Sequence, residues 1–516
     1  MSLNQNDQGQ LLVTDPNAVG STAVNQKTAF GEELVANLTP EIQLQFPYNI
    51  NAILIDSTSN GGSVSSVNNM AKLSTGASAN RIAHLISKDL IKYNPGQGGL
   101  WRGTAVFTAG AANSTQIIGI GEPFDGYFFG FNGATFGVQR KQGGKPEIQT
   151  LTITAGAVTD AGNITITLDG DAKVVAVANA DTVDEVVDKI VATSFDSVGD
   201  GWLLHKIGVT GGSSTISFCS RSPGDKSGTF SFVDTDTTGV AATFAETLAG
   251  ASTTTTVVNQ SSWNQDTFDG TGDSGVTLDP TKGNVYQIRY QWLGFGAIEF
   301  SIENPETGVF TIVHRIKYAN TVTIPSVDNP TFSLFAGVEN TSNTSDIVMY
   351  SGSMAGFTEG KEELLGIRRG VSANTAGVTT TEKHLISIRN KIIYQSLVNR
   401  VKVKVNILSG SSAFSAGNGE VTLRFYANPI LTAAVWTDVS TNTSVVQKDT
   451  SATGINVAGA AELFAMTLSD KSSQIIDLTS DIHAGHLNPG NIISVTGETS
   501  QGTTEIDIAL NFIEFF

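Results

Sequence analysis

The stretch Val285–Tyr318, VYQIRYQWLGFGAIEFSIENPETGVFTIVHRIKY, alternates apolar and polar residues more regularly than any other part of the chain. Its large apolar side chains fall at alternate positions of three successive segments: Tyr286, Ile288, Tyr290 and Trp292; Ile298, Phe300 and Ile302; Phe310, Ile312, Ile316 and Tyr318. A period of two residues is typical of strands with one buried face. The stretch therefore predicts an antiparallel meander whose apolar face needs a covering layer and whose polar face, with Gln287, Arg289 and Glu299, lies in water.

The covering layer is expected far upstream, in residues 100–139. This segment contains a second set of large apolar residues, Trp101, Val106, Phe107, Tyr127, Phe128, Phe129, Phe131, Phe136 and Val138. Within it Asn132-Gly133 separates two apolar runs, and Asn-Gly is the strongest short signal for a hairpin turn. We therefore expect the two stretches to face each other as the layers of one β-sandwich.

The segment between these two halves has a different character. It contains several strand-like runs and one helical pattern, Asp181–Ser194, which opens with Thr182 and Glu185 in capping-box spacing. Its valines and isoleucine fall on one helical stripe, Val183, Val186, Val187, Ile190 and Val191. These features predict a small α+β domain, residues 146–261, inserted into a sandwich formed by residues 46–145 and 262–358.

The remaining segments complete the predicted domain organisation. Residues 1–45 form a polar N-terminal arm with a short helix at 30–36, residues 359–377 form a linker, and residues 378–516 hold about eight strands at sandwich spacing. Residues 81–93 fit either a short helix or a strand, and we favour the strand. The predicted fold class is mainly β: two antiparallel β-sandwich domains, of the jelly-roll or lectin-like kind, with a small α+β domain inserted in the first.

Composition narrows the classes of function. The chain has 516 residues, of which 40% are hydrophobic and only 15% charged, as expected of a turn-rich β protein. A net charge of -18 disfavours binding to nucleic acid. Basic residues gather in one region only, and we expect them on a solvated face: Arg368, Arg369, Lys383, Arg389, Lys391, Arg400, Lys402 and Lys404. The last three alternate with valines, as on the wet face of a strand.

The single cysteine, Cys219, excludes a disulfide within the chain, so stability must come from burial, bound ions or association with other chains. This fits assembly in a reducing cytoplasm. The sequence shows no secretory signal and no apolar run long enough to span a bilayer, so we expect no membrane insertion.

Motifs for catalysis are not found. Among the six histidines only His483 and His486 are close, and their loop lacks the third ligand of a metal site. Cys219 follows Phe218 in a strand-like run and is expected to be an inert buried thiol. No nucleophile elbow or phosphate-binding loop occurs, and a pair of glycosidase carboxylates, which can be distant in sequence, is left open. We expect no enzyme and no organic cofactor.

One cluster of carboxylates could bind a metal ion. Asp266, Asp269 and Asp273 lie within DTFDGTGDSG, and oxygen ligands on a glycine-rich loop suit Ca²⁺. The spacing departs from the EF-hand pattern and lacks its closing glutamate, so an ordinary solvated turn is the competing interpretation.

Four passages add a resemblance: NPGQGGLWRGTAVFTAGAANSTQIIGIGEPFDGYFFGFNG (Asn94–Gly133), residues 278–320, residues 437–454 leading to NPGNIISVTGE (Asn488–Glu498), and TLTITAGAVTDAGNITITLDGD (Thr150–Asp171). The chain resembles virion structural proteins of tailed bacteriophages and other large double-stranded DNA viruses, of the fibre, decoration or appendage kind. The last passage is similar to small modules of phage head and tail proteins. The resemblance implies a place on the virion and supplies no catalytic residues.

The expected function is therefore that of a non-enzymatic virion structural protein, a head or tail appendage anchored by its N-terminal region. Its expected partners are copies of itself, most simply as a homotrimer, and other virion proteins. The alternative is an adhesin that binds a host receptor or glycan through a lectin-like sandwich face, with Ca²⁺ at the three aspartates. A carbohydrate-active enzyme on the same folds is the third hypothesis.

Overall fold

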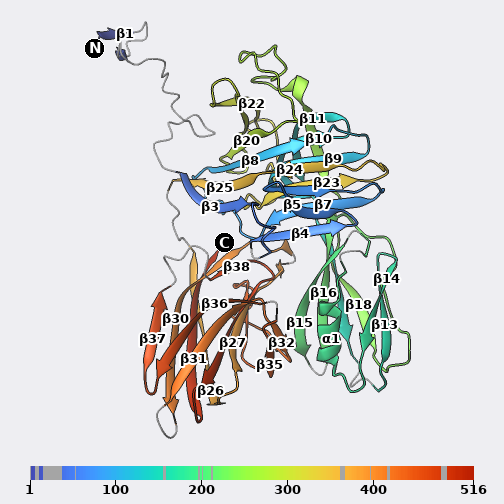
Figure 1. Cartoon of the computed structure of the whole chain (residues 1–516), viewed down its shortest axis with the longest axis vertical. Helices are drawn as coiled ribbons and strands as arrows, with labels where there is room; N and C mark the ends of the chain where they lie inside the picture. The colour runs from blue at the N-terminus through green and yellow to red at the C-terminus, as the bar shows by residue number, and fades with distance from the viewer. Residues whose placement is uncertain are drawn as a thin grey trace.

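Antiparallel strands dominate the computed structural model, which confirms the predicted fold class (Figure 1). The structure describes residues 38–516 except 53, 155–158, 196–197, 200, 211–212, 361–365, 396, 415–418, 459 and 478–484, together with the backbone of β1 (Ser2–Gln5) and β2 (Leu11–Thr14). The helix predicted at residues 30–36 lies outside the described residues. None of the helices in the described part of the chain has the length and apolar character that crossing a membrane requires.

The first sandwich consists of two facing sheets. One has the strand order β19-β11-β10-β9-β23-β7-β4, with β4 (Ile55–Asn60), β7 (Arg81–Ser87), β9 (Ser114–Glu122), β10 (Asp125–Asn132), β11 (Thr135–Gln142), β19 (Thr254–Asn259) and β23 (Leu334–Asn340). The other has the order β22-β21-β20-β8-β24-β6-β5, joined at β8 by β25 and β3, with β3 (Leu38–Gln45), β5 (Ser63–Val67), β6 (Met70–Ser74), β8 (Gly99–Phe107), β20 (Asn284–Tyr290), β21 (Ile298–Glu303), β22 (Phe310–Ile316), β24 (Val348–Ser351) and β25 (Ser353–Glu359).

Aromatic side chains fill the space between these two sheets. The ring of Phe129 lies 5.2 Å from that of Phe300 and 4.9 Å from that of Tyr286, and all three side chains are fully buried. Strands β10 and β11 of the predicted covering layer therefore pack against the meander. Trp101, Val106 and Phe107 were expected in that layer too, but β8 pairs with β20, with Trp101 opposite Ile288, and so lies in the same sheet as the meander. The predicted hairpin also forms, with Asn132 opposite Thr135 and Gly133 at φ 61°. Glycine adopts such a backbone readily because it has no Cβ.

The outer face of the second sheet differs from the prediction. Gln287, Arg289 and Glu299 were expected in water, but they are 4–7% exposed. Their polar groups are satisfied across neighbouring strands: Arg289 Nη2 lies 2.7 Å from Glu359 Oε1, and Glu299 Oε2 lies 2.6 Å from Arg315 Nη2. Charge pairing makes burial of these side chains tolerable, and sequence alternation alone does not reveal it.

The inserted module spans residues 146–251 and contains two small sheets and one helix. Its elements are β12 (Pro146–Ile153), β13 (Gly162–Leu168), β14 (Asp171–Val177), α1 (Val183–Ala192), β15 (Trp202–Thr210), β16 (Ser213–Pro223), β17 (Ser231–Asp234) and β18 (Ala242–Leu248). Helix α1 has the predicted capping box of Thr182 and Glu185, and it buries Val186, Val187 and Ile190 against the sheet β15-β16-β12-β18.

The boundary predicted at residue 261 is corrected by strand β19. Its residues Thr254–Asn259 pair with β11 of the first sandwich, and a bridge between Lys145 and Ala251 closes the neck of the module. The segment is rich in threonine and serine, and its β-branched residues form an edge strand of the first sandwich.

The C-terminal sandwich spans residues 366–516 and packs two sheets. The first contains β26 (Ile367–Val378), β30 (Lys402–Phe414), β37 (Ser473–Asp477), β38 (His486–Leu487) and β40 (Thr504–Phe515). The second contains β27 (Lys383–Asn390), β31 (Glu420–Ala427), β33 (Thr437–Asp438), β34 (Val446–Asp449), β36 (Ala461–Ser469) and β39 (Ile492–Thr499). Short pairs are formed by β28 (Ile393–Tyr394), β29 (Leu397–Val398), β32 (Ile430–Thr432) and β35 (Gly454–Asn456).

Two further boundaries differ from the prediction. Residues 38–45 were assigned to the arm, but β3 pairs with β25 in the first sandwich. Residues 359–377 were assigned to a linker, but β26 pairs with β40 from Ile367 opposite Glu514 onward. Their pairing partners lie more than a hundred residues away in sequence, so local patterns did not assign either segment to a sheet.

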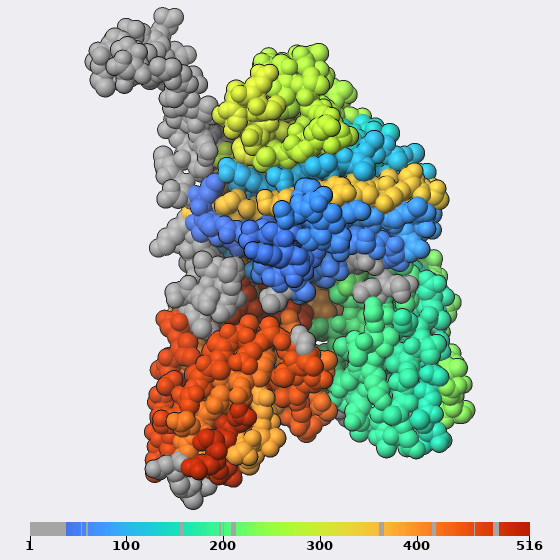
Figure 2. Space-filling view, viewed as in Figure 1, coloured from blue at the N-terminus to red at the C-terminus, as the bar shows by residue number. Residues whose placement is uncertain are grey.

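The three bodies meet at one place. The first sandwich lies above, and the C-terminal sandwich and the inserted module lie side by side beneath it (Figure 1). Figure 2 shows both lower bodies abutting the blue strands of the first sandwich, with a seam between them.

Candidate functional site

The predicted calcium loop uses its carboxylates to hold its own turns. Asp266 is 4% exposed, and its two oxygens accept hydrogen bonds from Phe268 N at 2.9 Å and Ser274 N at 2.8 Å. Asp269 is exposed, and hydrogen bonds from Thr271 and Thr267 lower its pKa to about 2. Asp273 is also exposed.

No three His, Cys, Asp or Glu side chains are grouped to hold a metal ion in the part of the chain that the structure describes. Both carboxylate oxygens of Asp266 accept hydrogen bonds from backbone amides of the loop. Ca²⁺ at Asp266, Asp269 and Asp273 stays a prediction without geometric support.

Buried charged and polar side chains are concentrated at the junction of the three bodies. Here Arg400 of the C-terminal sandwich reaches into the turn between β9 and β10, and its side chain is only 8% exposed. Its Nη1 donates to Asp125 Oδ2 at 3.0 Å and to the carbonyl of Asn329 at 3.2 Å, while Nη2 donates to Glu122 Oε2 at 3.2 Å. Burial raises the pKa of Asp125 to about 6 even though Arg400 lies beside it.

A second contact joins the same two bodies. Asp89 Oδ1 accepts hydrogen bonds from His486 Nδ1 at 2.9 Å and from Asn488 Nδ2 at 3.3 Å. Burial would raise the pKa of Asp89, but His486 and the charge of Lys402 outweigh it and hold that pKa well below its usual value. Burial lowers the pKa of His486, so at neutral pH a neutral imidazole donates to an ionised carboxylate.

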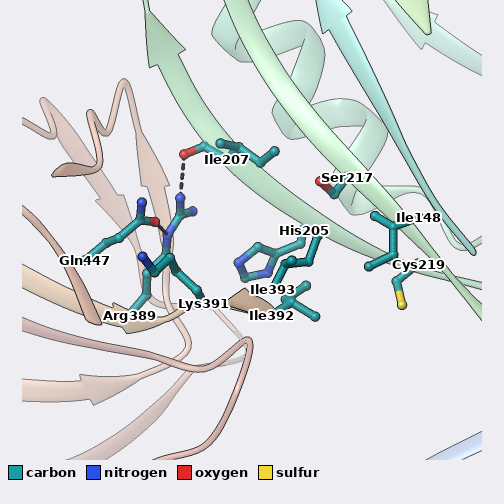
Figure 3. Close-up of a pocket in the computed structure, with 10 residues that line it drawn as sticks. All are labelled: Ile148, His205, Ile207, Ser217, Cys219, Arg389, Lys391, Ile392, Ile393 and Gln447. Atoms are coloured by element: carbon teal, nitrogen blue, oxygen red, sulfur yellow. Dashed lines mark hydrogen bonds between the residues drawn. The ribbon is translucent and has the colours of Figure 1, made fainter. Parts of the chain in front are cut away.

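The module and the C-terminal sandwich are joined through Arg389. Its guanidinium donates to the carbonyl of Ile207 at 2.6 Å (Figure 3). It also donates to the carbonyl of Lys206 and stacks 4.4 Å from the ring of Trp436. Asp184 of α1 accepts a hydrogen bond from Ala433 N at 2.6 Å. Each pair of bodies involving the C-terminal sandwich is therefore linked by buried polar contacts.

Two cavities lie in this junction and share His205, Cys219 and Ile392 as lining residues. The smaller, of about 130 Å³, lies between the outer face of β15 and β16 and the C-terminal sandwich, and the ring of His205 extends across it toward Ile392 and Ile393 (Figure 3). The larger, of about 440 Å³, is lined by all three bodies, among others by Ile86, Phe124, Leu203, Arg400 and Asn488.

The titratable groups in these cavities are strongly perturbed. Burial, together with the charge of Arg389, lowers the pKa of His205 to about 3. Burial raises the pKa of the Cys219 thiol to about 12, as the prediction of an inert thiol requires. His205 is therefore neutral at physiological pH, and the thiol is protonated.

The residues that build the junction are the ones that sequence reasoning dismissed. Arg389, Arg400, Lys402 and Lys404 were expected on a solvated face, yet Arg389, Lys402 and Lys404 are 2–6% exposed. The alternation with valines is present, but the face opposite the valines is covered by another body. The available signal was the concentration of basic residues in one region of an acidic chain.

Other predicted residues are dispersed. His84 Nε2 lies 2.9 Å from Glu339 Oε1, and His314 Nδ1 accepts a hydrogen bond from Asn264 N at 3.3 Å. His483 lies outside the described residues. Trp101, Trp202 and Trp263 are buried.

Comparisons with known proteins give no assignment at the level of sequence. No family model and no curated protein matches the chain. A legume lectin-like domain from Entamoeba histolytica is 8% identical, covering 62% of this chain and 98% of that chain, with a TM-score of 0.25. The exoplasmic/lumenal domain of VIP36, bound to Ca²⁺ and Man3GlcNAc, is 13% identical over 63% and 91%, with a TM-score of 0.23.

A third similar structure is viral. A triple jelly-roll protein from the turret of an archaeal virus is 7% identical, covering 94% of this chain and 98% of that chain, with a TM-score of 0.15. Superposition at these TM-scores is too poor to carry residues or functions across to this chain.

Proposed function

We propose that this chain is a non-enzymatic structural protein of a virus particle, an oligomeric head or tail appendage anchored by its N-terminal region. The observation that carries the proposal is the junction: buried contacts of Arg400, Arg389 and Asp89 tie three β bodies into one unit. An appendage must transmit force and keep its shape, and buried charge pairs specify one arrangement of bodies.

The resemblance adds support from a different direction. Two of the passages that resemble virion proteins, residues 94–133 and 278–320, supply the facing strands of the first sandwich. The resemblance therefore lies in the strands that form the first sandwich, which is the part on which a structural role would depend.

The test is binding to particles. We expect the full-length chain to sediment as an oligomer and to co-sediment with particles that lack it, and antibodies against it to label a fixed position on intact particles. A version without residues 1–37 should keep its fold and lose particle binding. A monomer that does not associate with particles would contradict the proposal.

Glycan binding is the second candidate function. Sugars often stack on exposed aromatic rings, but Trp101, Trp202 and Trp263 are buried and cannot form such a surface on a sandwich face. The larger cavity of the junction instead offers polar and apolar groups within one concave space. A glycan array with the purified chain, with and without EDTA, separates this candidate from a purely structural role.

A further inference from the structure

The larger cavity has the general character of a small-molecule site. At about 440 Å³ it falls within the range of about 300–1,000 Å³ found for such sites, and it lies between domains, where they often occur. Apolar side chains form much of its wall, among them Ile86, Leu90, Phe124 and Leu203.

Charged groups around the cavity already have partners of opposite sign or backbone acceptors. Arg400 is bound by Glu122 and Asp125, Arg221 Nη1 lies 3.5 Å from Asp56 Oδ2, and Lys88 Nζ donates to the carbonyl of Ala52 at 2.5 Å. An ionic ligand would have to break one of these pairs. The electrostatics of the site therefore favour an uncharged ligand.

Two polar atoms on the wall, by contrast, have no hydrogen-bond partner within the described residues. They are Nε2 of His205, on the module, and Oδ1 of Asn488, on the C-terminal sandwich. Asn488 is 7% exposed, so its oxygen is withdrawn from bulk water. Buried polar groups in folded proteins are almost always satisfied, so two such atoms, on residues that line one cavity from different bodies, point to something that binds between them.

We propose that this cavity binds an uncharged, hydroxyl-bearing ring compound, a neutral monosaccharide or disaccharide. A hydroxyl both donates and accepts, so one can donate to Asn488 Oδ1 while another bonds to the neutral imidazole of His205. The C–H face of a sugar ring packs on apolar side chains such as Leu90 and Phe124. The site is formed only when the bodies are docked, so ligand and junction stabilise each other.

The proposal is independent of the particle assignment, since it concerns the purified chain alone. A failure to bind particles would leave it intact, and its own failure would leave the structural role intact.

The first experiment is ligand-observed saturation-transfer NMR of the full chain with glucose, galactose, N-acetylglucosamine and maltose at millimolar concentrations. Glucuronic acid and glucosamine serve as charged analogues. We expect transfer to at least one neutral sugar, with a several-fold weaker signal for the charged analogues. The variants His205→Phe and Asn488→Leu should each abolish the signal, whereas Gln474→Leu, which removes an exposed amide on β37, should retain it.

A second measurement needs no variant. The ring nitrogen resonances of His205 should shift on titration with the bound sugar, whereas those of His314 and His384, which do not line the cavity, should not. No transfer to any neutral sugar, or binding that leaves the His205 ring unchanged, would overturn the proposal and mean that the two atoms bind only water.

Discussion

The core of the first sandwich and the junction between the three bodies are held together by different interactions. In the core, rings such as Phe129, Tyr286 and Phe300 pack in mutual contact without charge. In the junction, Arg400, Arg389 and Asp89 bury charge against partners on another body. Apolar packing is insensitive to pH and tolerant of orientation, whereas buried charge requires one geometry and one protonation state. The core should therefore determine whether the protein folds, and the junction how its bodies are arranged.

The largest expected effect lies in the core. Phe129→Ala removes a fully buried ring that touches Trp263, Tyr286 and Phe300, and should lower the free energy of unfolding by about 4 kcal/mol. Urea unfolding monitored by tryptophan fluorescence measures this change. Ile475→Ala, at a side chain that is 74% exposed, is the control and should change stability by less than about 0.5 kcal/mol. Equal effects of the two would show that the rings do not form the core.

The next effect separates the junction from the core. Arg400→Met leaves Glu122 and Asp125 buried without their cation, and should cost about 3 kcal/mol of coupling between bodies. In calorimetry we expect the C-terminal sandwich to unfold in a separate, earlier transition, while the first sandwich keeps its own. Arg424→Met removes a more exposed ion pair with Glu498 and should have an effect below about 1 kcal/mol. If Arg400→Met still unfolded in one transition at an unchanged temperature, the junction would not have the separate role proposed for it here.

A smaller effect is the response of the junction to acid. The pKa of His205 is lowered to about 3 in the folded protein, so below its ordinary pKa the unfolded chain binds a proton that the folded chain excludes. The contribution of His205 to the free energy of unfolding is therefore fully present above about pH 6.5. It falls as the pH is lowered, and about 2 kcal/mol is lost at pH 5.

His205→Phe should remove that part of the pH dependence. Thermal unfolding at neutral and mildly acid pH, compared between this variant and the unmodified protein, gives the difference directly. In Phe129→Ala the change of stability with pH should equal that of the unmodified protein, since the rings of the core do not titrate. If the stability of His205→Phe depended on pH as strongly as that of the unmodified protein, His205 would have to be protonated in the folded state.

The smallest effect is expected in the loop of Asp266, Asp269 and Asp273. This loop belongs neither to the core nor to the junction, so it gives a reference value for the change in stability. Asp266→Ala removes acceptors for Phe268 N and Ser274 N and should cost about 1–2 kcal/mol, with or without Ca²⁺. Asp273→Ala, at an exposed side chain, should have no measurable effect. If Ca²⁺ raised the melting temperature of the unmodified protein and of neither variant, the result would support a calcium site at these aspartates.

Local patterns predicted much of the fold. Alternation gave the strands around Tyr286 and Phe300, the Asn132-Gly133 pair gave a hairpin, and Thr182 with Glu185 gave the start of helix α1. The ambiguous residues 81–93 contain strand β7, as favoured. Errors arose at boundaries such as β19 and β26, where polar segments become strands only because a partner strand is present.

The candidate site could not be predicted in the same way. Residues in contact across the junction are far apart in sequence, 275 positions for Arg400 and Asp125 and 397 for His486 and Asp89. No periodicity connects such pairs, because their contact depends on how finished bodies dock.

By itself the sequence determined the β character, the helix-bearing insertion and the aromatic layers, because hydrophobic periodicity acts over a few residues and forces each strand to bury one face. Only the tertiary structure decided that the basic residues near Arg400 are buried and that a cavity forms between three bodies. The physical reason is that the favourable placement of a buried charge depends on the position of its counter-charge, and that position exists only after the separate bodies have come together.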